Sequence, residues 1–232
     1  MTGFVVEARV DTLAAKGQNG SAVLQVAEVI RERIKQGMLG PGHRLVETDL
    51  TGELGVSRGS VREALSRLAA EGLVTVEPYR GAMVRKMTRQ DVEHLYQVRE
   101  VLEGLAARLA AVRMGEPAAR KRVTAMLRAM ERSHPAEDRQ GYLEENTRFH
   151  QLIVELGGNP LAAETLRTLS TQIYRYMVRN LLDAQSRVRS CKQHIAVANA
   201  VLAGDGPKAE RLMRRHVRAS GEEVLKIVDA LG

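Results

Sequence analysis

Residues 55–77, GVSRGSVREALSRLAAEGLVTVE, decide the fold of the first part of the chain. Ser57 belongs to the residue types that cap the N-terminus of a helix, and Gly72 to those that end a helix. Between them, Val61, Leu65 and Leu68 recur at intervals of three and four residues, which predicts one amphipathic helix. The β-prone run LVTVE after Gly72 predicts a strand directly behind this helix.

Two more helices are predicted upstream of this segment. Residues 21–37 carry a stripe of apolar residues behind Ser21 as a cap, and residues 48–55 form a short helix between Thr48 as cap and Gly55 as stop. Downstream, the runs LVTVE and AMVRK are separated by the turn signal PYRG, which predicts a β-hairpin. Three helices with a tight glycine turn before the third, followed by a hairpin, form a winged helix-turn-helix.

The third helix of such a motif is the part that reads a DNA groove. At its N-terminal end, side chains reach base edges and backbone N–H groups can meet a phosphate. Between residues 57 and 89 the chain has seven basic and three acidic residues. A charge run alone is usually a solvated helix surface, but within a helix-turn-helix it indicates DNA binding. The expected contacts from this helix are Ser57, Arg58, Gly59, Ser60 and Arg62.

The composition of the whole chain agrees with a polyanionic partner. The 232 residues carry a net charge of +7, and the low aromatic content of 3% favours helices. Cys191 is the only cysteine, so no intrachain disulfide forms and a reducing compartment is expected. No apolar run approaches the ~20 residues of a membrane span, and the first residues lack the pattern of a secretory signal. We therefore expect a cytoplasmic protein without a membrane partner, and a flexible N-terminal arm at residues 1–20.

Helical patterns fill the rest of the chain. Breaks that contain Gly or Pro separate the expected helices, which span residues 91–113, 117–132, 138–156, 160–182, 187–203 and 207–230. Asp91 is the expected cap of the first of them. The predicted fold class is mainly α, with a winged helix-turn-helix and its small β-hairpin wing at residues 21–87, and an all-α helical bundle for effector binding and dimerisation at residues 88–232.

Three of the six histidines are expected to point into this bundle. In the segment EENTRFHQL, Asn146 and His150 lie four residues apart on one side of a helix. His194 and His216 lie at similar distances on either side of the break GDGP, so an antiparallel helix pair brings them to the same height. A single inward histidine is more often an ordinary core residue than a metal ligand. Three inward histidines at matched positions, together with Asn146, favour a buried metal site. The remaining histidines, expected on the surface or in turns, are His43, His94 and His134.

Arg99 is a separate candidate. It lies between Leu95 and Leu102 on the apolar stripe of the first bundle helix, where an unpaired charge is costly. Two interpretations stay open at this point. One is a structural ion pair with Glu103, and the other is a clamp for the carboxylate of a small effector, because a guanidinium binds a carboxylate with two hydrogen bonds.

Residues 34–84 resemble the DNA-binding domain of GntR-family transcriptional regulators. The core GVSRGSVREAL and a glycine at the tip of the wing carry the resemblance. It implies that Arg58, Arg62 and Gly81 contact operator DNA. Thr48 stands where some relatives carry a further DNA-contacting arginine, and we expect Arg44 or Arg80 to substitute for that arginine.

The second half resembles the FadR-type ligand-binding domain, called FCD, of one GntR subfamily. The segments DVEHLYQVREVLEGLAARLAA and NTRFHQLIVELGGNP, together with the last two helices, carry this resemblance. Many members of the subfamily bind a divalent metal through an Asp-x-x-x-His pair and two later histidines. The resemblance therefore implies metal ligands at Asn146, His150, His194 and His216, with Asn in place of the usual Asp.

These features predict a repressor that binds double-stranded operator DNA as a homodimer. A small organic-acid effector, bound in the metal-containing domain, is expected to weaken DNA binding. Zinc is the first expected ion, and nickel, iron or manganese are alternatives. Two other classes remain: a metal-responsive regulator with the ion itself as signal, and a metalloenzyme fused to a DNA-binding domain. The second would need a general base beside the histidines, and no HExxH pairing accompanies them, so no enzyme activity is expected.

Overall fold

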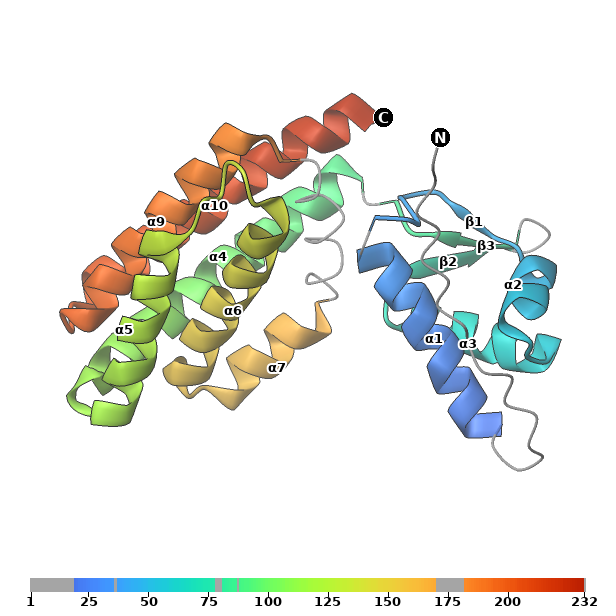
Figure 1. Cartoon of the computed structure of the whole chain (residues 1–232), viewed down its shortest axis with the longest axis horizontal. Helices are drawn as coiled ribbons and strands as arrows, with labels where there is room; N and C mark the ends of the chain where they lie inside the picture. Colours follow the sequence, from blue (N-terminus) through green and yellow to red (C-terminus); the bar gives the residue numbers. More distant parts are fainter. Residues whose placement is uncertain (1–18, 36, 78–80, 87, 170–181, 232) are drawn as a thin grey trace, which may run out of the picture. The chain divides into compact units, whose positions relative to one another are not determined.

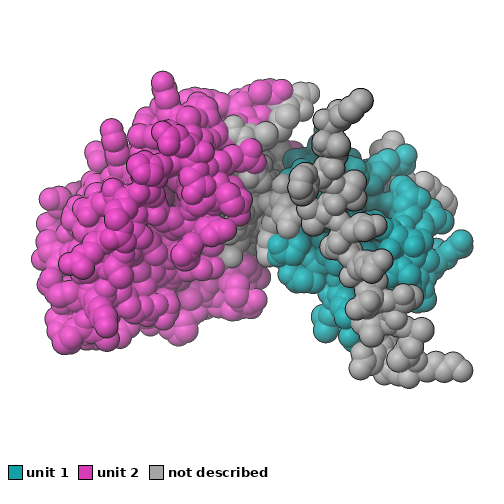
Figure 2. All heavy atoms as spheres, viewed as in Figure 1, with its two compact units in different colours: residues 1–86 teal, residues 87–232 magenta. Residues whose placement is uncertain are grey.

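The chain divides into two compact units, residues 1–86 and residues 87–232 (Figure 2). The residues that the computed structural model describes are 19–35, 37–77, 81–86, 88–169 and 182–231. Within these ranges, no helix is both long enough and apolar enough to cross a membrane. Each unit contains buried side chains of its own.

The first unit combines helices with a small antiparallel sheet (Figure 1). Its helices are α1 (Asn19–Lys35), α2 (Glu47–Leu54) and α3 (Arg58–Ala70), and its strands are β1 (Arg44–Leu45), β2 (Val74–Glu77) and β3 (Gly81–Val84). The strands lie in the order β1-β3-β2, and Glu77 pairs with Gly81 where β2 and β3 meet the wing turn. The predicted winged helix-turn-helix is confirmed by this arrangement.

The core of the first unit lies between α1 and α3. Ile30 of α1 and Val61 and Leu68 of α3 are fully buried. They belong to the stripes that repeat every three to four residues, and burying these stripes removes apolar surface from water. The packing fixes α3 so that the opposite side of the helix, with Arg58 and Arg62, remains in solvent.

Two predicted helix signals of this unit are confirmed. The Oγ atom of Ser57 accepts a hydrogen bond from the backbone N–H of Ser60 at 3.1 Å, which caps α3. Gly55 ends α2 in the left-handed conformation, with φ at +65°. Since a side chain disfavours this conformation, the glycine makes the tight turn between α2 and α3.

Two other predicted caps are wrong. Thr48 lies inside α2, which begins at Glu47 after Val46, and Val46 makes no side-chain cap. Ser21 also lies inside its helix, because α1 already begins at Asn19. The strand β1 was not predicted, since a strand of two residues is too short to show the alternation that marks a strand.

The second unit is the predicted all-helical bundle (Figure 1). Its helices are α4 (Arg89–Val112), α5 (Pro117–Arg132), α6 (Arg139–Gly157), α7 (Pro160–Thr168), α9 (Ala184–Leu202) and α10 (Gly206–Leu231), with a short 3-10 helix at Arg113–Gly115. The helix predicted at 160–182 corresponds to α7 as far as Thr168, and its residues 170–181 lie outside the described residues. The cap predicted at Asp91 is wrong: Thr88 is the N-cap of α4, and Asp91 pairs with it reciprocally in a capping box.

The directions of the helices around α4 follow from a few close contacts. α10 runs antiparallel to α4, because Gly221 approaches Tyr96 near the start of α4 and Gly206 approaches Arg108 near its end. α9 joins α10 through a short turn at Gly204, whose φ is +73°, so α9 runs in the same direction as α4. Figure 1 shows α9 and α10 side by side along the bundle.

α6 also runs parallel to α4. His150 meets Glu103, and Gly157 meets Ala106 further along both helices. A Cβ atom on Gly157 would lie 3.0 Å from the Cα atom of Ala106, so the two backbones approach closely only because residue 157 is glycine. This close approach brings the histidine of α6 into the centre of the bundle, where it is 4% exposed.

Candidate DNA-reading helix and metal centre

The N-terminal end of α3 presents an exposed polar and basic surface. Ser57, Arg58, Gly59 and Arg62 are all exposed. Ser60 differs, because it is 4% exposed and its hydroxyl lies 2.9 Å from that of Ser57. The hydroxyl of Ser60 therefore supports the helix cap inside the protein, and the predicted DNA contact of this residue stays a prediction.

Arg62 is held by a residue that the sequence did not single out. Its Nε atom donates a hydrogen bond to Oε2 of Glu47 at 2.7 Å, while 70% of the Arg62 side chain is exposed. Glu47 is the first residue of α2, so this ion pair connects the two helices of the motif. Because the bond uses Nε, the terminal nitrogens Nη1 and Nη2 can still form a fork on a guanine.

The other predicted DNA contacts lie on separate elements of the first unit. Arg44 is exposed on β1, and Thr48 is exposed in the first turn of α2. Gly81 begins β3 with φ at +83°, a backbone conformation that favours glycine. The prediction for Arg80 lies outside the described residues.

The three predicted histidines meet in the second unit. His150 of α6, His194 of α9 and His216 of α10 are each 4% exposed or less. The Nε2 atom of His216 lies 3.0 Å from Nε2 of His194 and 3.3 Å from Nε2 of His150. One ligand atom of each histidine lies within 4.8 Å of the others. The prediction that all three point inward is confirmed, and the remaining histidines are exposed, as predicted: His43, His94 and His134.

Side chains outside the cluster orient two of its imidazoles. The Nδ1–H of His150 donates to Oε2 of Glu103, because a carboxylate can only accept. The Nδ1 atom of His216 lies 2.9 Å from Oε1 of Gln193, an amide oxygen that also only accepts. A neutral imidazole carries one proton, so both rings turn an unprotonated Nε2 toward the cluster. In metal sites, hydrogen bonds of this kind to the second ring nitrogen orient a histidine and fix the tautomer in which it binds the metal.

One distance within the cluster fits a shared cation. Nε2 of His150 and Nε2 of His216 are both acceptors when neutral, yet they face each other at 3.3 Å. Two nitrogens bound to one zinc ion at ~2.0–2.1 Å in tetrahedral geometry lie about 3.3–3.4 Å apart. The separation of 3.3 Å therefore fits two ligands of one shared ion.

Arg99 and Glu103 form the ion pair that the sequence left as one of two interpretations. Nε and Nη2 of Arg99 donate to Oε1 of Glu103 at 2.9 and 2.6 Å, and Arg99 is 1% exposed. Burial alone would lower the pKa of Arg99, but the charge of Glu103 and the interactions with Tyr96 together outweigh it and hold that pKa above its ordinary value. The Nη1 atom of Arg99 has no hydrogen-bond partner among the described residues. The ion pair therefore leaves one guanidinium nitrogen available.

Asn146 lies one helical turn before His150 and is 3% exposed. Its Oδ1 atom is buried and has no hydrogen-bond partner within the described part of the chain. A buried carbonyl oxygen without a partner is costly, and a metal ion would satisfy it. The three histidines and Asn146 together therefore form a donor set that suits a divalent transition metal.

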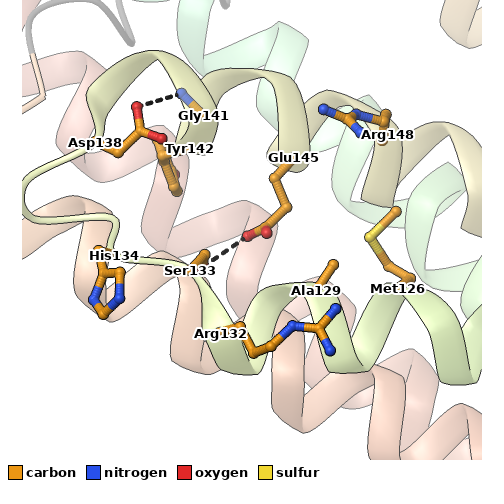
Figure 3. A pocket seen from close by; sticks show the side chains of 10 residues that line it. All are labelled: Met126, Ala129, Arg132, Ser133, His134, Asp138, Gly141, Tyr142, Glu145 and Arg148. Atoms are coloured by element: carbon orange, nitrogen blue, oxygen red, sulfur yellow. Dashed lines mark hydrogen bonds between the residues drawn. The ribbon is translucent and has the colours of Figure 1, made fainter.

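A surface pocket of about 310 Å³ lies between α5 and α6 (Figure 3). Figure 3 shows the Glu145 side chain crossing toward Ser133, which donates a hydrogen bond to it at 3.2 Å. Burial raises the pKa of Glu145, and this is partly offset by the bond from Ser133. None of the predicted site residues lines this pocket, so it is separate from the histidine cluster.

Both halves of the chain match known protein families. Residues 22–84 match the family of bacterial regulatory proteins named gntR, and residues 94–219 match the FCD domain. The HTH-type transcriptional repressor RspR of Escherichia coli K12 is 27% identical to this chain, over 88% of this chain and 89% of RspR. The Nta operon transcriptional regulator of Aminobacter aminovorans is 30% identical, over 81% of this chain and 87% of that protein.

Comparison with solved structures indicates the same family as the sequence matches. The crystal structure of a GntR transcriptional regulator from Rhodococcus sp. RHA1 aligns with a TM-score of 0.73 at 26% identity, covering 89% of this chain and 98% of that one. The relatives are transcriptional regulators and not enzymes, which confirms the predicted class. The chain therefore belongs to the gntR family of bacterial regulatory proteins, as a transcriptional regulator whose second half is an FCD domain.

Proposed function

We propose that this regulator is a cytoplasmic repressor that binds its operator as a homodimer and releases it when a small organic acid binds beside a metal ion in the FCD domain. One observation carries the effector part of the proposal. The buried side chains of Arg99 and Asn146 lie beside the three histidines. Each of the two has one polar atom without a hydrogen-bond partner among the described residues. Such atoms are satisfied when an ion and an anionic ligand are bound.

The proposed DNA contacts follow from what is exposed at α3 and the wing. Arg58 and Arg62 read base edges, and one arginine on a guanine contributes about 1–3 kcal/mol of discrimination. The N-terminus of α3 is exposed at Ser57 and Gly59, and it is suited to a phosphate because the first N–H groups of a helix have no partner within the helix. Gly81 lets the wing backbone approach the DNA closely. Arg44 and Thr48 are further proposed contacts, and both are exposed.

The proposed metal ligands are the Nε2 atoms of His150, His194 and His216 and the Oδ1 atom of Asn146. Zinc is the first candidate, and nickel, iron and manganese follow, because imidazole suits all of them. When bound, the ion supplies a positive charge that none of these neutral ligands compensates, and this charge favours an anionic effector. Glu103 and Gln193 hold the imidazoles of His150 and His216 in the tautomer that ligation requires.

Arg99 is the proposed clamp for the effector carboxylate. Its ion pair with Glu103 uses Nε and Nη2, and Nη1 remains as a buried donor. The pair keeps the guanidinium in one orientation, so little conformational freedom is lost when a carboxylate binds. Glu103 also binds His150, so the clamp and the histidine cluster are joined through one carboxylate.

The proposed homodimer would bury a stripe along α4. Apolar side chains recur there with alternating steps of three and four residues, the spacing at which two helices pack side by side. The stripe residues are Leu95, Val98, Leu102, Leu105, Leu109 and Val112. Val98 is 44% exposed and Val112 is 75% exposed, so the stripe is incompletely covered within one chain. A second copy of the chain is the proposed partner, because a two-fold dimer matches a near-palindromic operator.

A thermal-shift screen of small organic acids against the purified protein, with metal removed and with zinc restored, tests this function. We expect the protein as purified to contain metal, and the His150→Ala, His194→Ala and His216→Ala variants to contain much less. We also expect an acid that raises the melting temperature of the zinc-loaded protein to release operator DNA. Equal, near-zero metal in all four proteins would contradict the metal site, and a stabilising acid that leaves DNA binding unchanged would contradict the effector role.

A further inference from the structure

Three buried polar atoms without a partner lie in one layer of the FCD domain. They are Nη1 of Arg99, Oδ1 of Asn146 and Oγ of Ser190. The fourth such atom in the described ranges, the hydroxyl oxygen of Tyr142, lies one turn further from the histidines on α6. The three residues of the layer are 1%, 3% and 8% exposed, so water from the surface does not reach them freely. Arg99 and Asn146 have proposed roles above, whereas Ser190 so far has none.

The three residues share a layer because each lies one helical turn from the cluster around the histidines. The pairs, each four residues apart, are Arg99 and Glu103 on α4, Asn146 and His150 on α6, and Ser190 and His194 on α9. Four residues rise about 6 Å along a helix, so each member of the layer lies about this far from its partner in the cluster.

The layer lies on a single side of the cluster because these three helices run in one direction. α4 and α6 are parallel, as their contacts at Glu103 and Ala106 show. α6 and α9 are parallel too, because Arg187 at the start of α9 donates to the carbonyls of Pro135 and Ala136, just before α6 begins. In each of the three helices, the turn that precedes the cluster residue therefore lies toward the same end of the bundle.

Buried polar groups almost always have a hydrogen-bond partner, so three orphaned atoms in one layer indicate a polar occupant. Their chemistry differs. The guanidinium of Arg99 only donates, the amide oxygen of Asn146 only accepts or ligates a cation, and the hydroxyl of Ser190 does both. A carboxylate bound by Arg99 on α4 leaves Ser190 on α9 for a second polar group of the ligand. A hydroxyl group on the same ligand can both donate to Ser190 and accept from it.

We infer that Ser190 is a specificity-determining residue that binds a hydroxyl group of the effector, so that the FCD domain selects a hydroxycarboxylic acid over the carboxylic acid of equal chain length. The inference rests on the proposed function, because it places the effector carboxylate beside Arg99. A site that hydrogen-bonds a ligand hydroxyl discriminates strongly against the analogue that lacks it, because the polar group of the site is then left unpaired.

Isothermal titration calorimetry of the full-length, zinc-loaded protein with matched acids tests this inference. The pairs are lactate with propionate, 2-hydroxybutyrate with butyrate, and gluconate with hexanoate. We expect the hydroxylated acid to bind at least about tenfold more tightly in one or more pairs. In Ser190→Ala the preference should fall to about threefold or less, because the loss affects the hydroxylated acid and leaves the affinity of the other acid unchanged.

Ser186 offers a matched control on the same helix. It lies one turn before Ser190 and is 5% exposed, but its hydroxyl already lies 2.7 Å from Nη2 of Arg189. Ser186→Ala removes the same group at a similar depth and should leave the preference intact. Ser190→Thr retains a hydroxyl and should retain the preference. Equal metal content and equal melting temperature of the ligand-free variants show that the fold is unchanged.

The outcomes separate this inference from the proposed function. No preference in the wild-type protein, or a preference that survives in Ser190→Ala, overturns the role of Ser190 while the proposed function stands. Failure of every acid to bind overturns both. A preference that is lost in Ser190→Ala and kept in Ser186→Ala and Ser190→Thr supports the inference.

Discussion

Glu103 connects two parts of the FCD domain through its two carboxylate oxygens. Oε1 accepts from Arg99 and Oε2 accepts from His150. The sequence indicated the first contact, because Arg99 and Glu103 are four residues apart on one helix. It did not indicate the second, since His150 is 47 residues away on another helix. The inward position of the three histidines was predictable, because the helical period determines which side of a helix a residue occupies and the turn between two helices determines which residues lie level with each other. The partners of the Nδ1 atoms were not predictable, because they depend on how the helices pack.

The double role of Glu103 leads to a prediction on metal affinity. Glu103→Gln keeps the size of the side chain but weakens its acceptance from the His150 Nδ1–H. Loss of such an outer partner typically costs about 10–100-fold in metal affinity, and we expect a loss in this range in competition titrations with a chelator. Glu100→Gln is the control, because Glu100 binds Arg214 and Arg218 of α10 and none of the histidines. Equal metal affinity of the Glu103 and Glu100 variants would contradict this role.

Two arginines of the first unit should differ in what they contribute to DNA binding. Arg62→Ala should reduce discrimination between the operator and a variant with one changed base pair by about 1–3 kcal/mol. Arg85→Ala, beyond the end of β3, should weaken binding to both sequences equally and reduce the salt dependence by about one phosphate contact. Fluorescence anisotropy with both DNA sequences at several salt concentrations separates the two effects. A uniform loss for Arg62→Ala would show that this arginine contacts phosphate and not a base.

At the level of elements, the sequence predicted where helices form better than where they start. Apolar periodicity gave α5 at residues 117–132, with the bounds that the structure has. The caps of α2 and α4 were misplaced, because Thr48 and Asp91 are good cap residues that lie two and three residues after the actual N-cap positions. Several polar residues near a helix start can all serve as a cap, and the packing of the preceding chain decides which of them does.

The close approach of α6 to α4 gives a prediction on stability. Gly157→Ala would place a Cβ atom 3.0 Å from the Cα atom and 3.1 Å from the carbonyl oxygen of Ala106. Since backbone atoms cannot move aside easily, we expect a loss of about 1–3 kcal/mol in the free energy of unfolding. Gly115→Ala is the control, because a Cβ there meets nothing within 4 Å. Chemical denaturation should give a lower free energy of unfolding for Gly157→Ala than for Gly115→Ala. Equal free energies would mean that α4 and α6 do not approach each other this closely.

The stripe on α4 gives a prediction on the oligomeric state. Val98→Glu would bury a charge in the proposed dimer contact, and unpaired buried charges are strongly unfavourable. We expect this variant to be monomeric at concentrations at which the wild-type protein is a dimer, as measured by sedimentation velocity. Gln97→Glu adds the same charge to a neighbouring exposed position outside the stripe and should remain a dimer. A dimeric Val98→Glu protein would place the contact elsewhere.

At the scale of the whole molecule, one chain combines a DNA-binding unit with an FCD domain. Membership of the gntR family fixes the class, and the sequence motifs of both halves were sufficient to predict it. The identity of the signal follows less directly, because a histidine cluster alone is compatible with the ion as signal. The Nη1 atom of Arg99 favours an organic anion, since a metal-only sensor has no use for a buried guanidinium nitrogen without a hydrogen-bond partner among the described residues. Regulation then requires that the anion bind the DNA-competent and DNA-released forms with different affinity.

The most direct test is the operator affinity of the zinc-loaded protein, titrated with a stabilising organic acid, for the wild type and for Arg99→Lys. Lysine keeps the charge next to Glu103 but lacks the forked nitrogen that would bind the acid. We expect the acid to weaken operator binding of the wild type at least about tenfold, which is a typical allosteric coupling, and to leave operator binding of Arg99→Lys unaffected. Operator binding that follows the zinc concentration alone, with no response to any acid, would contradict it.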